Sequence, residues 1–181
     1  MSKTETIKWK VELEIQKFFN NESYKKGIPD EVLTVQGNQL TYDGTQHIWN
    51  RLIGSASTLP FNHESSAVGI GNSDMAIDFT DTLQSKLQGV NQQFVKMDDD
   101  FPRIIRPEIG NIEGVSLLFR STFTEDQGNF DWREWGIANY FDPVTLLPNP
   151  AYIMLNRKVE PMGTKAIGST WIVLTRIRLV S

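Results

Sequence analysis

The chain contains no cysteine among its 181 residues, and only two histidines. The absence of cysteine excludes disulfide bonds, thiolate metal sites and cysteine nucleophiles, and leaves the redox compartment open. A metal site needs three or four ligands, and a catalytic triad needs a histidine beside its nucleophile. His47 and His63 have no partner at such spacing. We therefore expect structural or surface histidines and no metal site built on histidine.

Basic charge and long apolar runs are also scarce. The formal net charge is −4, so no basic surface is expected to neutralise nucleic-acid phosphates. No apolar run approaches the roughly 18–20 residues that cross a bilayer, and the polar first residues do not resemble a secretory signal. Hydrophobic residues make up 39% of the chain, as in globular proteins. We expect a globular protein, made in a cytoplasm, that binds neither nucleic acid nor membranes.

Motifs for catalysis or cofactor binding are weak. Gly69-x-Gly71 lacks the third glycine of a dinucleotide fingerprint and the Gly-Lys-Ser/Thr of a P-loop, so we interpret it as a backbone bend or bulge. Asp98-Asp99-Asp100 does not match a calcium-binding EF-hand loop. A solvated loop is the main interpretation of this acidic run, and a bound calcium or magnesium ion is the alternative. We predict no catalytic residue, no cofactor and no enzymatic activity.

Residues 7–16 alternate between apolar and polar side chains. This period of two predicts a strand with one buried and one solvated face. Such a strand either pairs within its own domain or adds to the sheet edge of a neighbouring molecule, and the pattern leaves both options open. We divide the chain into an N-terminal strand or arm at 1–31 and a β-sandwich domain at 32–181. The candidate inter-subunit arm consists of Ile7, Trp9, Val11, Leu13 and Ile15.

The densest aromatic stretch lies at 128–139, where two of the five tryptophans stand beside charged residues. We expect a strand with a small slip between Trp132 and Trp135, with Asp131, Arg133 and Glu134 toward solvent. Each aromatic side chain buries on the order of 150–250 Å². These side chains are therefore expected to fill the core rather than to line an active site. The predicted core and fold residues are Trp132, Trp135, Phe130, Trp171, Phe119 and Phe123.

The remaining pattern is mostly that of short strands separated by Gly, Pro and Asn turns. The segments 32–36 and 39–42 predict a hairpin closed by Gly37-Asn38. A short helix is expected to begin at Thr45 and to stop at Gly54. The predicted fold is mainly β: an antiparallel β-sandwich with one or two short helices and an extended N-terminal strand.

An ordered series of short motifs runs through residues 40–180. The motifs are Leu40-Thr41-x-x-Gly44, Val68-Gly69-Ile70-Gly71-Asn72, Asp81-Thr82-Leu83-Gln84, Asp98 to Phe101-Pro102, Phe119-x-Ser121-Thr122-Phe123, Asn129-Phe130-x-Trp132-Arg133-Glu134-Trp135-Gly136-Ile137, Leu155-Asn156-Arg157, Gly163-Thr164-Lys165 and Ser169-Thr170-Trp171. In this order they resemble a group of tailed-bacteriophage virion structural proteins, either capsid decoration (cement) or neck proteins, and more distantly the N-terminal domain of phage tail-collar fibres.

This resemblance implies a non-enzymatic virion protein that binds the particle surface and ties capsomers together. Its implied partner is the major capsid protein, or alternatively a neck or fibre protein, and its implied location is the virion. We expect a homo-oligomer, with a trimer as one arrangement. The chain departs from tail-collar fibres in lacking a shaft and tip after residue 181 and in having the alternating strand at its start. A carbohydrate-binding module is the remaining alternative, with exposed aromatics stacking on sugars.

Overall fold

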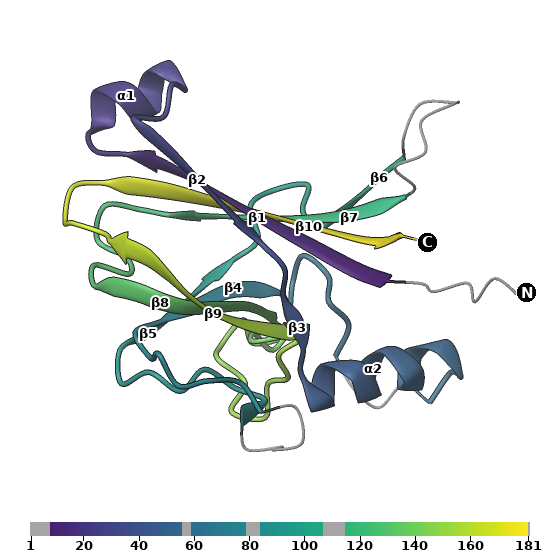
Figure 1. Cartoon of the computed structure of the whole chain (residues 1–181). Helices are drawn as coiled ribbons and strands as arrows, with labels where there is room; N and C mark the ends of the chain where they lie inside the picture. Colours follow the sequence, from purple (N-terminus) through teal and green to yellow (C-terminus); the bar gives the residue numbers. More distant parts are fainter. Residues whose placement is uncertain (1–7, 56–58, 79–83, 107–114, 181) are drawn as a thin grey trace, which may run out of the picture.

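The computed structural model describes residues 8–55, 59–78, 84–106 and 115–180. Two antiparallel sheets of five strands each pack face to face (Figure 1), which confirms the predicted β-sandwich. Sheet A consists, in spatial order, of β2 (Glu31–Gln36), β1 (Lys8–Phe18), β10 (Thr170–Val180), β7 (Ser116–Phe123) and β6 (Arg103–Ile105). Sheet B consists of β3 (Gln39–Leu40), β9 (Asn156–Thr164), β8 (Asp131–Ala138), β4 (Ala67–Gly71) and β5 (Gln92–Lys96).

The space between the sheets is filled by aromatic and branched side chains. Trp132 lies at its centre, with its ring centroid 4.8 Å from that of Phe123 and 4.7 Å from that of Trp171. Both pairs have the edge-to-face geometry that aromatic rings prefer. The Trp132 indole N–H donates to the Gly128 carbonyl at 2.7 Å, so its one polar group is satisfied inside the core.

The N-terminal strand is an interior strand of the sandwich and not an arm. β1 pairs with β10 over eleven residues and with β2 on its other side. Val11, Leu13 and Ile15 are at most 1% exposed and join the same core cluster as the residues of sheet B, while Trp9 is partly buried against it. Ile7 lies outside the described residues. The predicted boundary at residue 31 and the candidate inter-subunit arm are therefore wrong, because both edges of β1 are already paired.

The predicted hairpin at Gly37-Asn38 is also wrong. β2 pairs only with β1 in sheet A, whereas β3 pairs with β9 in sheet B. Gly37, at φ 78°, and Asn38 carry the chain from one sheet to the other. The positive-φ signal marked a change of direction but could not show that the next strand joins a different sheet.

Two short helices flank the sheets. α1 (Asn21–Lys26) is capped by Asn20, whose side chain accepts from the N–H groups of Glu22 and Ser23. α2 (Tyr42–Leu52) begins one turn before the predicted Thr45, because Thr41 is its N-cap and accepts from Gly44 N–H at 2.9 Å. Gly44 is a residue of this helix, and a Cβ at its position would be 2.2 Å from the Leu155 carbonyl oxygen. The glycine therefore permits close contact between α2 and the chain entering β9.

Replacing Leu13 by Ala tests the interior position of β1. We expect the free energy of unfolding to fall by about 2–5 kcal/mol, because the substitution leaves a cavity between the sheets. The matched control is Lys8→Ala at the exposed first residue of the same strand, which should change stability by less than about 0.5 kcal/mol. Urea unfolding followed by tryptophan fluorescence measures both. A Leu13→Ala protein as stable as the control would place β1 outside the core.

Candidate functional site

The aromatic residues predicted as core lie inside the sandwich. Trp132, Trp135, Trp171, Phe119 and Phe123 are buried in one cluster, and Phe130 packs against it partly exposed, just before β8. The predicted slip in the tryptophan strand is present as a register shift between Trp132 and Glu134. The rings of these buried aromatic residues are therefore packed against other side chains instead of lining an open cleft.

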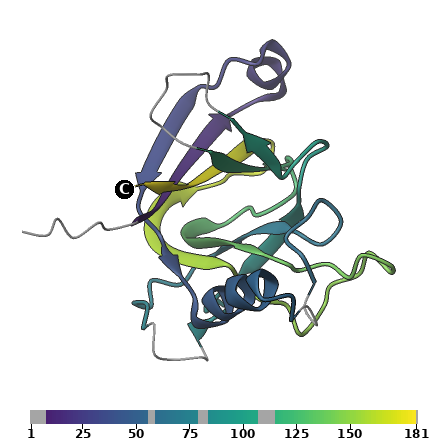
Figure 2. The same ribbon diagram turned by 90° about the vertical axis from the view of Figure 1, so that its right-hand side faces the viewer.

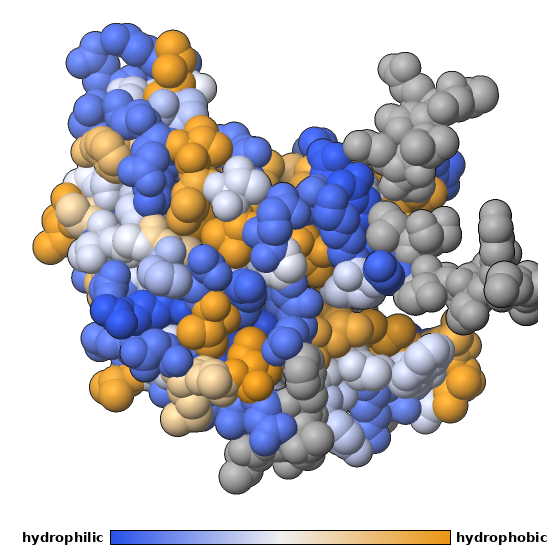
Figure 3. Space-filling model, in the orientation of Figure 1, coloured by the Kyte–Doolittle hydropathy of each residue, from blue (hydrophilic) through white to orange (hydrophobic). Residues whose placement is uncertain are grey.

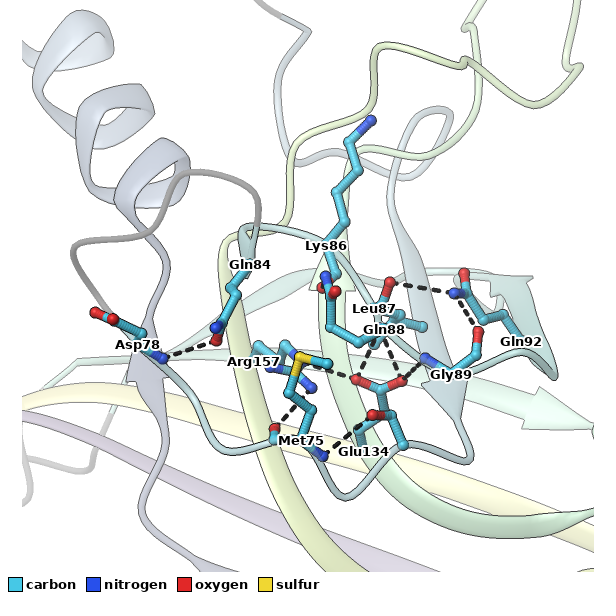
Figure 4. A network of polar contacts seen from close by, with 11 residues as sticks. Met75, Asp78, Gln84, Lys86, Leu87, Gln88, Gly89, Gln92, Glu134 and Arg157 are labelled. Atoms are coloured by element: carbon cyan, nitrogen blue, oxygen red, sulfur yellow. Dashed lines mark hydrogen bonds and ion pairs between the residues drawn. The ribbon is translucent and has the colours of Figure 1, made fainter.

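Glu134 is the main departure within this stretch. The sequence pattern placed it toward solvent, but its side chain is fully buried on the outer side of sheet B and pairs with the equally buried Arg157 of β9. Arg157 Nε donates to Glu134 Oε2 at 2.7 Å, and Arg157 Nη2 donates to the Met75 carbonyl at 3.1 Å. Figure 4 shows this pair enclosed by the segment that crosses the outside of the sheet.

Backbone groups complete the coordination of the Glu134 carboxylate. Gly89 N–H donates to Oε1 at 2.6 Å, and Gln88 N–H donates to the same oxygen at 3.0 Å. A Cβ at Gly71 would be 2.4 Å from Glu134 Oε1, and one at Gly89 would be 3.0 Å from it. Gly71 therefore makes room for the carboxylate in a regular strand, and the predicted bend or bulge at Gly69-x-Gly71 is absent.

This network fastens Met75, Gln88 and Gly89 to the outer side of sheet B. The Glu134 carboxylate is fully buried and accepts from Arg157 and from two backbone N–H groups, whereas glycoside cleavage needs two carboxylates roughly 5–10 Å apart with room for substrate. Around Glu134, Arg157 and the backbone N–H groups of Gln88 and Gly89 lie against the carboxylate. Sequence reasoning missed Arg157 because no spacing rule links residues 23 apart on neighbouring strands. Gly71 and Gly136 on strands β4 and β8 are local signs of close packing at this site.

Asp98 and the two histidines have structural partners, whereas Asp99 and Asp100 are exposed. Asp98 accepts from Thr122 N–H at 2.9 Å and from Thr122 Oγ1 at 2.7 Å, and it forms an ion pair with Arg120. His47 is buried against Phe61, and burial, together with the nearby Arg51, lowers its pKa. His63 Nδ1 lies 3.0 Å from the Phe101 carbonyl. Over the described residues, no group of three or more acidic or histidine side chains could hold a metal ion.

Lys165 is a second buried charge. It is 1% exposed, and its Nζ donates to the Thr124 carbonyl at 2.7 Å and to Asn129 Oδ1 at 2.9 Å. Burial lowers its pKa to about 8, partly opposed by the carboxylates of Asp126 and Glu125. This lysine ties the turn after β7 to the end of β9, at the margin of the aromatic core.

Exposed apolar side chains lie at the end of the sandwich where β1 begins and β10 ends. An apolar groove of about 290 Å³ lies where sheet A extends past the core, lined by Trp9, Ile104, Val115, Leu117, Ile177 and Leu179. α2 reaches the same end, below the sheets in Figure 2. Trp49 and Leu52 of this helix and Ile53 at its C-cap are 59%, 72% and 76% exposed. Figure 3 shows hydrophobic surface at the far end of the helix, at the lower right, beside pale and hydrophilic surface. We call these three residues together with the groove the apolar end surface.

Ile48, Trp49, Leu52 and Ile53 have the spacing of one helix face, but only Ile48 of these four packs against the core. Instead, the inward side of α2 carries Gly44 and His47. The helix is fastened to the sheet through its N-cap, since Thr41 N–H donates to the Leu155 carbonyl at 3.2 Å and Thr41 Oγ1 donates to the Met154 carbonyl. Three large apolar side chains are thereby left outward.

Comparisons of the chain with protein-family models, with curated proteins and with solved structures found no match. Within the described ranges, no helix is long and apolar enough to cross a membrane. Function must therefore be argued from the residues of this chain and from its two contrasting regions: the buried Glu134–Arg157 ion pair on the outer side of sheet B and the apolar end surface.

Glu134→Gln tests whether the buried pair is structural. Removing one partner leaves the other charge buried and uncompensated, so we expect a loss of about 3–5 kcal/mol in unfolding free energy. The double variant Glu134→Leu/Arg157→Met should recover most of that loss, because neither charge remains buried. Glu22→Gln, which breaks the exposed pair with Lys26, serves as the control and should leave the urea midpoint unchanged. Equal effects of Glu134→Gln and Glu22→Gln would contradict this assignment.

Lys165 predicts a specific pH dependence. The unfolded chain keeps this proton up to an ordinary pKa of 10.5, whereas the folded protein releases it at about 8. Unfolding free energy should therefore rise from pH 8 toward pH 10, because the unfolded state binds more protons there. Tyr152 acts in the opposite direction above pH 10, since burial raises its pKa to about 12.

The reference for that measurement is Lys165→Met, which keeps an apolar stem and removes the titrating group. Urea unfolding at several pH values should show a steeper rise for the unmodified protein than for the variant. Parallel pH curves would mean that the lysine is not protonated differently in the two states.

Proposed function

We propose that this chain is a non-enzymatic structural protein of a tailed-bacteriophage virion, which binds the particle surface and stabilises it as a capsid decoration (cement) protein. The observation that carries the proposal is the apolar end surface, on a protein whose large sheet aromatics and central charges are already buried. The order of motifs through residues 40–180, which resembles that of phage virion proteins, supplies the biological setting. We infer the major capsid protein as the partner.

The composition of this surface suits protein binding. Contiguous exposed apolar patches mark interaction sites on soluble proteins, and tryptophan is enriched among the residues that dominate interface energies. Trp49, Leu52 and Ile53 project from one short helix. These residues and the groove each offer apolar contacts to a capsid surface.

Attachment to a symmetric lattice does not require a tight single contact. When each copy touches several capsid subunits, the later contacts form at high effective concentration, and total attachment greatly exceeds that of one contact. A patch of a few apolar side chains is therefore sufficient for a decoration role. The interior position of β1 means that this role is assigned to the apolar end surface and no longer to the first residues.

The carbohydrate-binding alternative receives less support. Trp132 and Trp135, the aromatics on which sugars would stack, are 0% and 1% exposed. Glu134, one of the few acidic candidates for hydrolysis, is paired with Arg157. Both observations favour a binding role for the surface and a structural role for the sheets.

The double variant Trp49→Ser/Leu52→Ser tests the proposed attachment. Affinity for particles assembled without this protein should fall about tenfold or more, because two central apolar contacts are removed. The matched control is Val144→Ser/Leu147→Ser, which removes two exposed apolar side chains from a distant loop and should bind normally. Co-sedimentation with particles measures both, and thermal melting confirms that both remain folded. Equal binding by the two variants would remove α2 from the attachment surface.

The same particles separate decoration from the neck or tail-collar alternative. Symmetry fixes the copy number, so quantitative mass spectrometry should find on the order of hundreds of copies per particle for a capsid protein. About six to eighteen copies would assign the chain to the neck or tail. Particles carrying no copy would overturn the virion proposal itself.

A further inference from the structure

The sheet margins differ in how they are protected. Exposed strand edges invite pairing with other chains, and proteins usually guard them with charges, prolines or short length. β6 has three residues, including Arg103, and β5 ends at Lys96. The part of β9 beyond its two-residue pairing with β3 carries Lys158, Glu160 and Pro161.

β2 has none of these guards. Residues 32–36 read Val-Leu-Thr-Val-Gln, without a charge, glycine or proline. The one charged residue of the strand, Glu31, is held toward β1 by an ion pair with Lys17 at 2.7 Å. Figure 1 shows β2 along the margin of sheet A, on the way from α1 to β3.

The unpaired backbone groups of β2 can be assigned from its pairing with β1. Gly37 N–H donates to the Val11 carbonyl at 3.0 Å, and Val35 and Leu33 stand opposite Leu13 and Ile15. Hydrogen-bonded positions alternate along an antiparallel pair. The N–H and C=O groups of Val32, Thr34 and Gln36 therefore point away from β1, and no described strand pairs with them.

We propose that this edge pairs with β2 of a second copy of the chain, antiparallel, about a two-fold axis at Thr34. Sheet A then runs continuously through both copies. In this register Thr34 faces Thr34, Leu33 faces Val35, and Val32 faces Gln36. Every outward backbone group of residues 32, 34 and 36 gains a partner.

Self-pairing fits this strand for two reasons. A two-fold interface requires a patch that is complementary to itself, and here no charge meets a like charge, because residues 32–36 are uncharged and Glu31 stands opposite Gly37. The pairing also places apolar side chains next to apolar side chains on the core face, and threonine next to threonine on the outer face, which are favourable cross-strand combinations.

This inference is independent of the proposed function. The β2 edge shares no residue with the apolar end surface, so dimerisation in solution and attachment to particles are tested by different variants. A dimer without particle binding would leave the inference standing and the function proposal wrong. Particle binding by a monomer would do the reverse.

The absence of cysteine makes the test direct. Thr34→Cys introduces the only thiol, so any disulfide must join two copies. Residues opposite one another at a hydrogen-bonded position have Cα atoms about 5.5 Å apart, which suits a disulfide. We expect mild oxidation to convert most of the Thr34→Cys protein to a covalent dimer. The matched control, Thr164→Cys at an exposed position of β9, should remain largely monomeric under denaturing electrophoresis.

Thr34→Pro provides the complementary measurement. Proline removes an N–H that β1 does not use, so the fold should persist while the dimer edge is broken. Sedimentation velocity should find a dimer for the unmodified protein and a monomer with unchanged circular dichroism for Thr34→Pro. A monomeric unmodified protein, or a dimer that survives Thr34→Pro, would overturn the inference. A monomer whose particle binding is lost in Thr34→Pro would instead assign the edge to a strand of a capsid protein.

Discussion

The fold depends on burying the inner faces of two sheets against each other, and Trp132 is at the centre of that contact. Its ring touches Phe123 and Trp171 of sheet A edge-to-face, while its N–H is satisfied by Gly128. The strands that supply these residues come from distant parts of the chain. Without β1, strand β2 would have no neighbour in sheet A, because β1 lies between β2 and the C-terminal strand β10.

A second constraint acts on the outer side of sheet B. Antiparallel sheets commonly leave such a face to solvent. Here Met75, Gln88 and Gly89 lie over it and are fastened to the buried pair of Glu134 and Arg157. Glu134 and Arg157 thereby hold this part of the structure together.

The sequence was sufficient where local periodicity determines structure. Alternation identified β1 and the tryptophan strand, and aromatic content identified five buried core residues together with the partly buried Phe130. It was insufficient where partners are distant. Glu134 looked like a solvent-facing residue because nothing nearby announces Arg157, and Gly37-Asn38 looked like a hairpin turn because positive-φ residues do not specify the sheet that the chain joins next. The exposed face of α2 was missed because the apolar pattern of a helix cannot show which face packs inward.

Together these features describe a packed interior and two proposed binding regions, which are the apolar end surface and the unpaired edge of β2. The most direct test of this account is a cryo-electron-microscopy reconstruction of particles carrying the protein. The account predicts copies on the capsid lattice, with α2 and the adjoining groove against the major capsid protein. Copies absent from the particle, or copies that contact the capsid only through the segment covering Glu134 while α2 faces solvent, would contradict it.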